Sequence, residues 1–197
     1  MNMFRTTGVT VAAAGLVIAS LAPAASATPG PAFLSARQLP PSSSPWQAGP
    51  VRAGVAPDAC TQKATPKKKS KHREFGTEFD TNAQQTTTVL ATPKEAKALA
   101  TKLRAAVRTC LARLQKQYPT LEGETRFHGR IAVEEGAHVY SLDTRDPVVG
   151  PSDIALYSVG RDGRTVTVVR WAQMGDLDHA PLAAFKKTAR TSVAKLY

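Results

Sequence analysis

Apolar residues recur along this chain with two different spacings, which predict two helices and six strands. Steps of three and four residues, typical of the inner stripe of an amphipathic helix, occur over residues 93–117 and 181–196. Runs of β-branched and aromatic residues bounded by turn residues predict strands over residues 75–79, 84–91, 125–133, 137–143, 153–159 and 165–171. The order ββαββββα predicts an α+β fold with a mostly antiparallel sheet of about six strands and both helices packed on one face.

The first helix carries a clear start signal. Thr92-Pro93-Lys94-Glu95 is a capping-box pattern with proline at the first helical position, and Pro119 marks the end of the helix. The outer faces of this helix hold seven cations, which we interpret as a solvated surface, with anion binding as the alternative. These are Lys94, Lys97, Lys102, Arg104, Arg108, Arg113 and Lys116.

The last two strands form a hairpin through Asp162-Gly163, a dipeptide suited to a tight turn. If Arg161 pairs with Arg164, then Leu156 faces Val169 and Ile154 faces Trp171. Apolar residues then appear on both faces, so the face away from the helices needs a cover or forms an apolar surface. We expect a ligand to bind on a concave sheet face around four residues of this hairpin. These candidates are Leu156, Tyr157, Val169 and Trp171.

The first 27 residues have the order of a signal peptide. Arg5 supplies the positive charge, residues 9–21 are apolar, and Ala25-Ser26-Ala27 is a small-residue cleavage site. A membrane anchor is the alternative, but the run is shorter than the ~20 apolar residues that a spanning helix needs. We therefore expect cleavage after Ala27, no transmembrane segment afterwards, and a secreted product.

Residues 28–58 are rich in proline, alanine, glycine and serine, and their apolar residues follow neither the helical nor the strand spacing. This composition predicts a disordered tail, with a single α+β domain over residues 59–197. Trp46 is unusual in such a segment, and the sequence leaves open whether it docks on the domain.

The chain is strongly basic. It has 26 Lys and Arg residues against 15 Asp and Glu residues, a formal net charge of +11 and a pI near 10.0. A basic run at the domain junction, residues 67–73, predicts either tethering to an acidic envelope polymer or solubility alone. The candidate contacts are Lys67, Lys68, Lys69, Lys71 and Arg73. No aromatic residue interleaves this run, so specific recognition of nucleic acid is not expected.

Cys60 and Cys110 are the two cysteines of the chain. In an oxidising compartment an even pair predicts one disulfide, with two buried free thiols as the alternative. Cys110 lies on the apolar stripe of the first helix, so a bridge would hold the start of the domain under that helix.

The sequence contains no recognisable catalytic or metal-binding motif. The four histidines, His72, His128, His138 and His179, do not have zinc-site spacing. Asp176, Asp178 and His179 cluster before the last helix, where we interpret Asp178 as a helix-start residue. We therefore expect no catalytic residue, no bound metal and no cofactor.

The chain nevertheless resembles a known group of domains. The resemblance rests on a signal peptide, a low-complexity tail, a cysteine near the domain start, the helix end Ala106-Val107-Arg108-Thr109-Cys110-Leu111, and strands closing on a C-terminal helix. This arrangement resembles secreted actinobacterial sensor-like domains of the PknH-type extracellular class. The resemblance implies an α+β domain with a groove and a role in binding a small ligand or a wall fragment. It supplies no catalytic residues.

Together these features favour a secreted, non-enzymatic binding or sensor-like module of the cell envelope or extracellular space. Its expected partner is a small ligand or a cell-wall fragment. Two alternatives remain at this point: a protein that associates with an acidic wall polymer through residues 67–73, and an enzyme without a recognisable motif.

Overall fold

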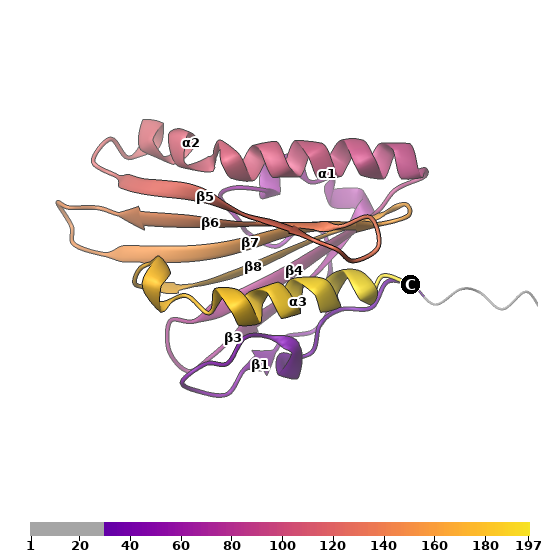
Figure 1. Cartoon of the computed structure of the whole chain (residues 1–197), viewed down its shortest axis with the longest axis horizontal. Helices are drawn as coiled ribbons and strands as arrows, with labels where there is room; N and C mark the ends of the chain where they lie inside the picture. Colours follow the sequence, from indigo (N-terminus) through magenta and orange to yellow (C-terminus); the bar gives the residue numbers. More distant parts are fainter. Residues whose placement is uncertain (1–29) are drawn as a thin grey trace, which may run out of the picture.

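The computed structural model of the chain describes residues 30–197. The predicted signal peptide, residues 1–27, lies outside the described residues. The described part is built on one sheet of eight strands, all paired antiparallel, in the order β1-β3-β4-β8-β7-β6-β5, with β2 also pairing with β3. Figure 1 shows this sheet with helices along it. The α+β class and the mostly antiparallel sheet are confirmed.

Five of the long strands match the predicted ones closely, and two short strands come from the segment predicted to be a tail. The strand predicted over residues 75–79 is wrong in its bounds, because the observed strand runs over Ser70–Gly76 and shares only residues 75 and 76 with the prediction. The strands are β1 (Gln47–Ala48), β2 (Arg52–Ala53), β3 (Ser70–Gly76), β4 (Asn82–Val89), β5 (Glu122–Ile131), β6 (Ala137–Arg145), β7 (Ser152–Asp162) and β8 (Thr165–Met174). Most of the long strands extend beyond the predicted bounds, because polar residues at their ends still pair with neighbouring backbone.

The helices are α1 (Pro93–Arg108), α2 (Cys110–Gln117) and α3 (Leu182–Ala194), with 3-10 turns η1 (Ala36–Gln38), η2 (Gln62–Ala64), η3 (Lys67–Lys69) and η4 (Leu177–His179). Thr92 caps the helix as predicted, because Glu95 N donates to Thr92 Oγ1 over 3.2 Å. The reciprocal half of the predicted capping box differs, because the Glu95 carboxylate accepts the Ala91 N–H and not the Thr92 N–H. The single helix predicted over residues 93–117 is interrupted at Thr109, whose hydroxyl donates to Ala105 O.

The helices lie on opposite faces of the sheet, so the prediction that both pack on one face is wrong. Residues of α1 and α2 pack with Tyr157, Val159 and Val168, whereas α3 packs with Leu156 and Val169. Figure 1 shows α1 and α2 end to end along the sheet, well separated from α3. The cause is the apolar character of both faces of β7 and β8, since each face needs its own cover.

The β7–β8 hairpin has a different register from the predicted one. Asp162 pairs with Thr165, so the two-residue loop is Gly163-Arg164, and Gly163 adopts a φ of 49°. Leu156 consequently lies opposite Trp171 instead of Val169. This shift moves the pairing by two positions along the partner strand and therefore leaves each side chain on its predicted face.

Residues 30–58 are packed against the sheet, which corrects the prediction of a disordered tail and extends the folded domain beyond residues 59–197. Leu34 is fully buried in the core beneath α3, and its backbone N–H donates to Gln85 Oε1 over 2.7 Å. Trp46 docks on the same core, and its indole N–H donates to Pro40 O. The segment is irregular, so it has no helical or strand period that sequence patterning could detect.

Cys60 and Cys110 form the predicted disulfide, with their Cα atoms 5.1 Å apart. Both residues are buried in the core between α1, α2 and the sheet. The bridge therefore fixes residues 57–60 against the beginning of α2. None of the helices within residues 30–197 is long and apolar enough to cross a membrane.

Candidate functional site

The four residues predicted to bind a ligand are not on one accessible surface. Leu156, Val169 and Trp171 have exposed fractions of 0%, 0% and 1% and belong to the core under α3. Tyr157 points to the opposite face, because successive side chains of a strand alternate between faces. The predicted concave apolar site is therefore wrong for three residues, and Tyr157 alone borders a cavity.

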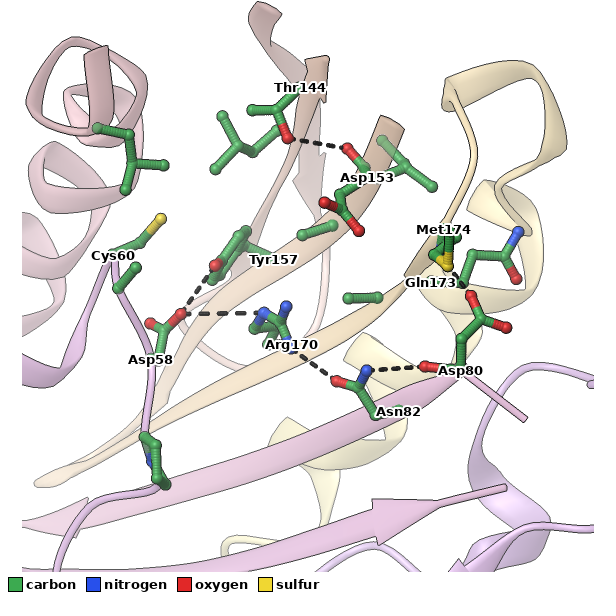
Figure 2. Close-up of a pocket in the computed structure, with 17 residues that line it drawn as sticks. Asp58, Cys60, Asp80, Asn82, Thr144, Asp153, Tyr157, Arg170, Gln173 and Met174 are labelled. Carbon is green, nitrogen blue, oxygen red and sulfur yellow. Dashed lines mark hydrogen bonds and ion pairs between the residues drawn. The ribbon is translucent and has the colours of Figure 1, made fainter. Parts of the chain in front are cut away.

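That cavity is a cleft of about 620 Å³ at the disulfide end of the sheet (Figure 2). It lies between residues 57–60, the α2 residue Leu114 and one end of β4, β6, β7 and β8. Buried apolar side chains contribute to its lining, namely Leu142, Ala155 and Ala172. Its volume is within the range of small-molecule sites, ~300–1,000 Å³.

A buried carboxylate organises one wall of the cleft. The side chain of Asp58 is only 2% exposed. Its Oδ1 accepts the Tyr157 hydroxyl over 2.8 Å and lies 3.9 Å from Arg170 Nε. Its Oδ2 accepts the Thr61 backbone N–H over 2.6 Å and also the Thr61 hydroxyl. Asp58 thus has hydrogen-bond partners at both oxygens, as a buried charge requires.

The polar chain continues from Arg170 across the sheet to the other wall. Arg170 Nη1 donates to Asn82 Oδ1 over 2.7 Å, and Asn82 Nδ2 donates to Asp80 O over 3.0 Å. The Asp80 carboxylate in turn accepts the Met174 backbone N–H. Figure 2 shows this chain running from Asp58 to Asp80 along the cleft. These contacts fix the side chains before any ligand arrives, which reduces the entropy lost on binding.

The hydroxyl of Tyr157 is a hydrogen-bond donor and not a base. Burial raises the pKa of Tyr157 well above its ordinary value, and the neighbouring negative charge of Asp58 raises this pKa further. The phenol therefore stays protonated throughout the physiological pH range.

The cleft is acidic although the protein is basic. Three carboxylates line it, those of Asp58, Asp80 and Asp153, against the single guanidinium of Arg170. Asp80 and Asp153 are exposed and lie at the rim of the cleft. The site therefore favours a cationic or neutral polar ligand over an anion.

The histidines and acidic residues singled out in the sequence lie elsewhere. His72 is buried in β3, His128 contacts Ser141, His138 contacts Arg104, and His179 contacts Asp176. Within residues 30–197 no three His, Cys, Asp or Glu side chains come together as a metal site. Asp176, and not Asp178, caps η4, and α3 begins only at Leu182. The interpretation of Asp178 as the start of the last helix is therefore wrong.

The basic run, residues 67–73, is part of the folded domain. Lys67–Lys69 form η3, and the following residues begin β3, which pairs on both sides. Arg73 donates to Gly49 O over 2.8 Å and to Leu34 O over 2.9 Å, so it holds the N-terminal segment in place. Lys67, Lys68, Lys69 and Lys71 are exposed. Contact of these lysines with an acidic polymer stays a prediction.

Comparisons with protein families, curated proteins and solved structures found no match for this chain. The resemblance to PknH-type extracellular domains therefore stays a prediction.

The sequence reasoning missed Asp58, Asp80, Asn82, Asp153 and Arg170, which lie far apart along the chain. One signal was available: Arg170 is a lone cation within the otherwise uncharged strand β8. A charge at such a position needs a partner, and the structure supplies Asp58.

Proposed function

We propose that the protein is a secreted, non-enzymatic binding module that takes a small polar ligand into the cleft beside Asp58. The observation that carries this proposal is the network that joins the buried side chains of Asp58 and Tyr157 to the partly exposed Arg170, which is complete before a ligand binds. Such a network beside an open cavity supports recognition with little reorganisation.

The chemistry of the lining indicates the kind of ligand. The apolar residues Leu142, Ala155 and Ala172 suit a small hydrocarbon or sugar-ring surface, and the rim carboxylates of Asp80 and Asp153 suit an amine or hydroxyl groups. An amine-bearing wall fragment, such as one containing an amino sugar or a diamino acid, has both features. We therefore propose this ligand class.

Binding accounts for the site better than turnover does. Both oxygens of Asp58 already accept hydrogen bonds within the protein, and the raised pKa of Tyr157 keeps its proton in place. None of the four histidines lines the cleft. The groups that line this cavity therefore hold and orient, and none of them is set up as an activated nucleophile.

Export is part of the proposal. The predicted signal peptide directs the chain out of the cytoplasm, and the Cys60–Cys110 disulfide is compatible with an oxidising compartment. A wall fragment is a ligand that a protein would meet there.

Three sugars with one ring frame but different charges test the proposal: glucosamine, glucose and glucuronate. We expect the affinity to fall in that order, because the rim carboxylates attract the ammonium group and repel the carboxylate. The Asp153→Asn variant should weaken glucosamine binding by about threefold, the effect of one partly exposed charge pair, and leave glucose unchanged. Isothermal titration calorimetry measures each affinity.

Asp178→Asn is the matched control, because Asp178 is exposed and lies outside the cleft. It should bind all three sugars as the unmodified protein does. Equal affinity for the three sugars, a preference for glucuronate, or no binding of any of them would contradict the proposal.

A further inference from the structure

A second cleft, of about 320 Å³, lies between α1 and the strands β5, β6 and β7. Its charged lining is mainly cationic, and its apolar residues are Ala100 and Val159. The basic side chains in it are Lys97, Arg104, Arg130, His138 and Arg161. They come from three strands and a helix, so the fold gathers cations that are dispersed in the sequence.

Most of this positive charge has no counter-charge among the residues that the structure describes. The one carboxylate in the lining, that of Glu135, accepts Arg161 Nη1 over 2.9 Å and the Gly163 N–H over 3.0 Å. None of the side chains of Lys97, Arg104 and Arg130 lies within 4.0 Å of a carboxylate in residues 30–197. Three cations therefore share a concave surface without a carboxylate partner, an arrangement that is unfavourable unless an anion joins them.

The guanidinium groups of Arg104 and Arg130 are held in position by the surrounding chain. Arg130 Nη2 donates to Glu135 O over 3.0 Å, and the guanidinium lies against Gly136, where an added Cβ would stand 2.3 Å from Arg130 Nε. Arg104 Nη2 donates to Thr101 Oγ1 over 2.8 Å. Gly136 has a φ of 100°, so glycine meets both the backbone and the space requirement at this turn.

His138 lies among these cations. Arg104 Nη1 is 3.1 Å from His138 Nε2, and the Phe127 ring stacks on the imidazole with centroids 5.8 Å apart. The pKa of His138 is lowered by burial and then by the positive charges of Arg104, Arg130 and Arg108. The other charged groups around the cleft are Lys97 on α1, Arg161 on β7 and the engaged Glu135. A bound anion would offset these cations and allow His138 to take up a proton.

From this geometry we infer that the α1–β6 cleft is a binding site for a tetrahedral oxyanion, the phosphate or sulfate group of an ester. Arg104 and Arg130 present N–H groups to the oxygens, and Lys97 adds a third positive charge at the mouth. Guanidinium groups suit such oxyanions because each can donate two parallel hydrogen bonds. The cleft also has room for part of the organic group that carries the anion. The inference is independent of the acidic cleft beside Asp58.

Nuclear magnetic resonance of the His138 ring tests the inference, with inorganic phosphate as the probe and sodium chloride at equal ionic strength as the reference. We expect a saturable shift of the His138 ring signals with phosphate and a rise in the pKa of His138. Binding of inorganic sulfate, whose charge does not change near neutral pH, should therefore strengthen as the pH falls through that pKa. The signals of His72 should not shift on addition of phosphate or sulfate. If phosphate and chloride have the same effect on His138, the inference is wrong.

The variants Arg104→Gln and Arg130→Gln each remove one guanidinium and should weaken phosphate binding by about tenfold or more, the usual effect of losing a charged hydrogen bond. Arg37→Gln, on the exposed turn η1, is the matched control and should bind phosphate normally. Thermal unfolding of each variant checks that it is folded. If Arg104→Gln is not folded, Arg130→Gln still tests the inference, because Arg130 is mostly exposed. Unchanged phosphate binding in a folded Arg130→Gln variant would overturn the inference.

Two further probes separate the sources of the anion. Glucose 6-phosphate represents a soluble ester, and poly(glycerol phosphate) represents an acidic wall polymer. If one of these probes binds more tightly than inorganic phosphate, and this binding is lost in Arg130→Gln, the result supports the site and identifies the source of the anion. Polymer retention that is lost only when Lys67, Lys68 and Lys69 are replaced would place anion binding on the other basic surface and contradict the site.

Discussion

Replacing Cys60 and Cys110 together by alanine is expected to lower the free energy of unfolding by about 4 kcal/mol. The two residues are 50 positions apart, and opening a loop of this length restores that much chain entropy to the unfolded state, ~4 kcal/mol. Urea denaturation followed by circular dichroism measures the loss. The unmodified protein with its disulfide reduced should show nearly the same stability as the double variant.

The same substitution should also weaken ligand binding in the acidic cleft. Asp58 lies two residues before Cys60, and the bridge holds this segment against the start of α2. Without the bridge the Asp58 carboxylate is less well fixed, so binding loses part of its preorganisation.

A double variant with a stability loss below ~1 kcal/mol would show that the disulfide is not a main support of the fold.

Replacing Leu34 by alanine is expected to cost about 2–5 kcal/mol, the range for a fully buried leucine. Leu34 is completely buried against the sheet, its backbone N–H donates to Gln85, and its carbonyl oxygen accepts a hydrogen bond from Arg73. The control is Val51→Ala in the same N-terminal segment, where the side chain is 45% exposed. It should change stability by less than ~0.5 kcal/mol. Equal, small effects of both substitutions would mean that residues 30–58 contribute nothing to the core.

Local sequence patterns were sufficient for much of the fold. The β-branched and aromatic runs located five of the six long strands, because the preference of a side chain for a strand is local. Thr92 located the start of α1, because helix capping depends on nearby residues. The alternation of Leu156 and Tyr157 placed apolar residues on both faces of the hairpin. That observation already required a cover for each face. Helix α3 covers one face, and α1 and α2 together cover the other.

The N-terminal segment was beyond the reach of those patterns. Leu34 and Trp46 are anchors in an irregular chain. They are held by long-range contacts, in which Leu34 contacts Gln85 and Arg73 and both residues pack on the core. A proline-rich composition is shared by disordered tails and by irregular segments that cover a sheet. Only the tertiary contacts distinguish the two cases, since no local period does.

The two clefts also depend on tertiary contacts. Asp58 reaches Tyr157 across 99 positions, and Arg104 reaches His138 across 34. In the sequence Arg104 was one of seven cations on a solvated helix, and nothing local separated it from the others. The sheet distinguishes Arg104 from the other helix cations, because it places Arg130 and His138 beside Arg104. It places the acidic residues at the other cleft.

The two clefts have opposite charge although β7 contributes to both. The acidic cleft uses Asp153 and Tyr157, and the basic one uses Val159 and Arg161 further along the same strand. A zwitterionic wall fragment has groups of both signs, but the two sites are tested separately, with glucosamine for one and phosphate for the other.

The most direct test of the binding proposal is the mapping of backbone amide signals during titration with a muropeptide digest of a bacterial wall. The account predicts saturable shifts centred on residues 57–60, 80–82, 153–157 and 170–174, which line the acidic cleft. An absence of shifts, or shifts confined to the exposed lysines at 67–71, would contradict it.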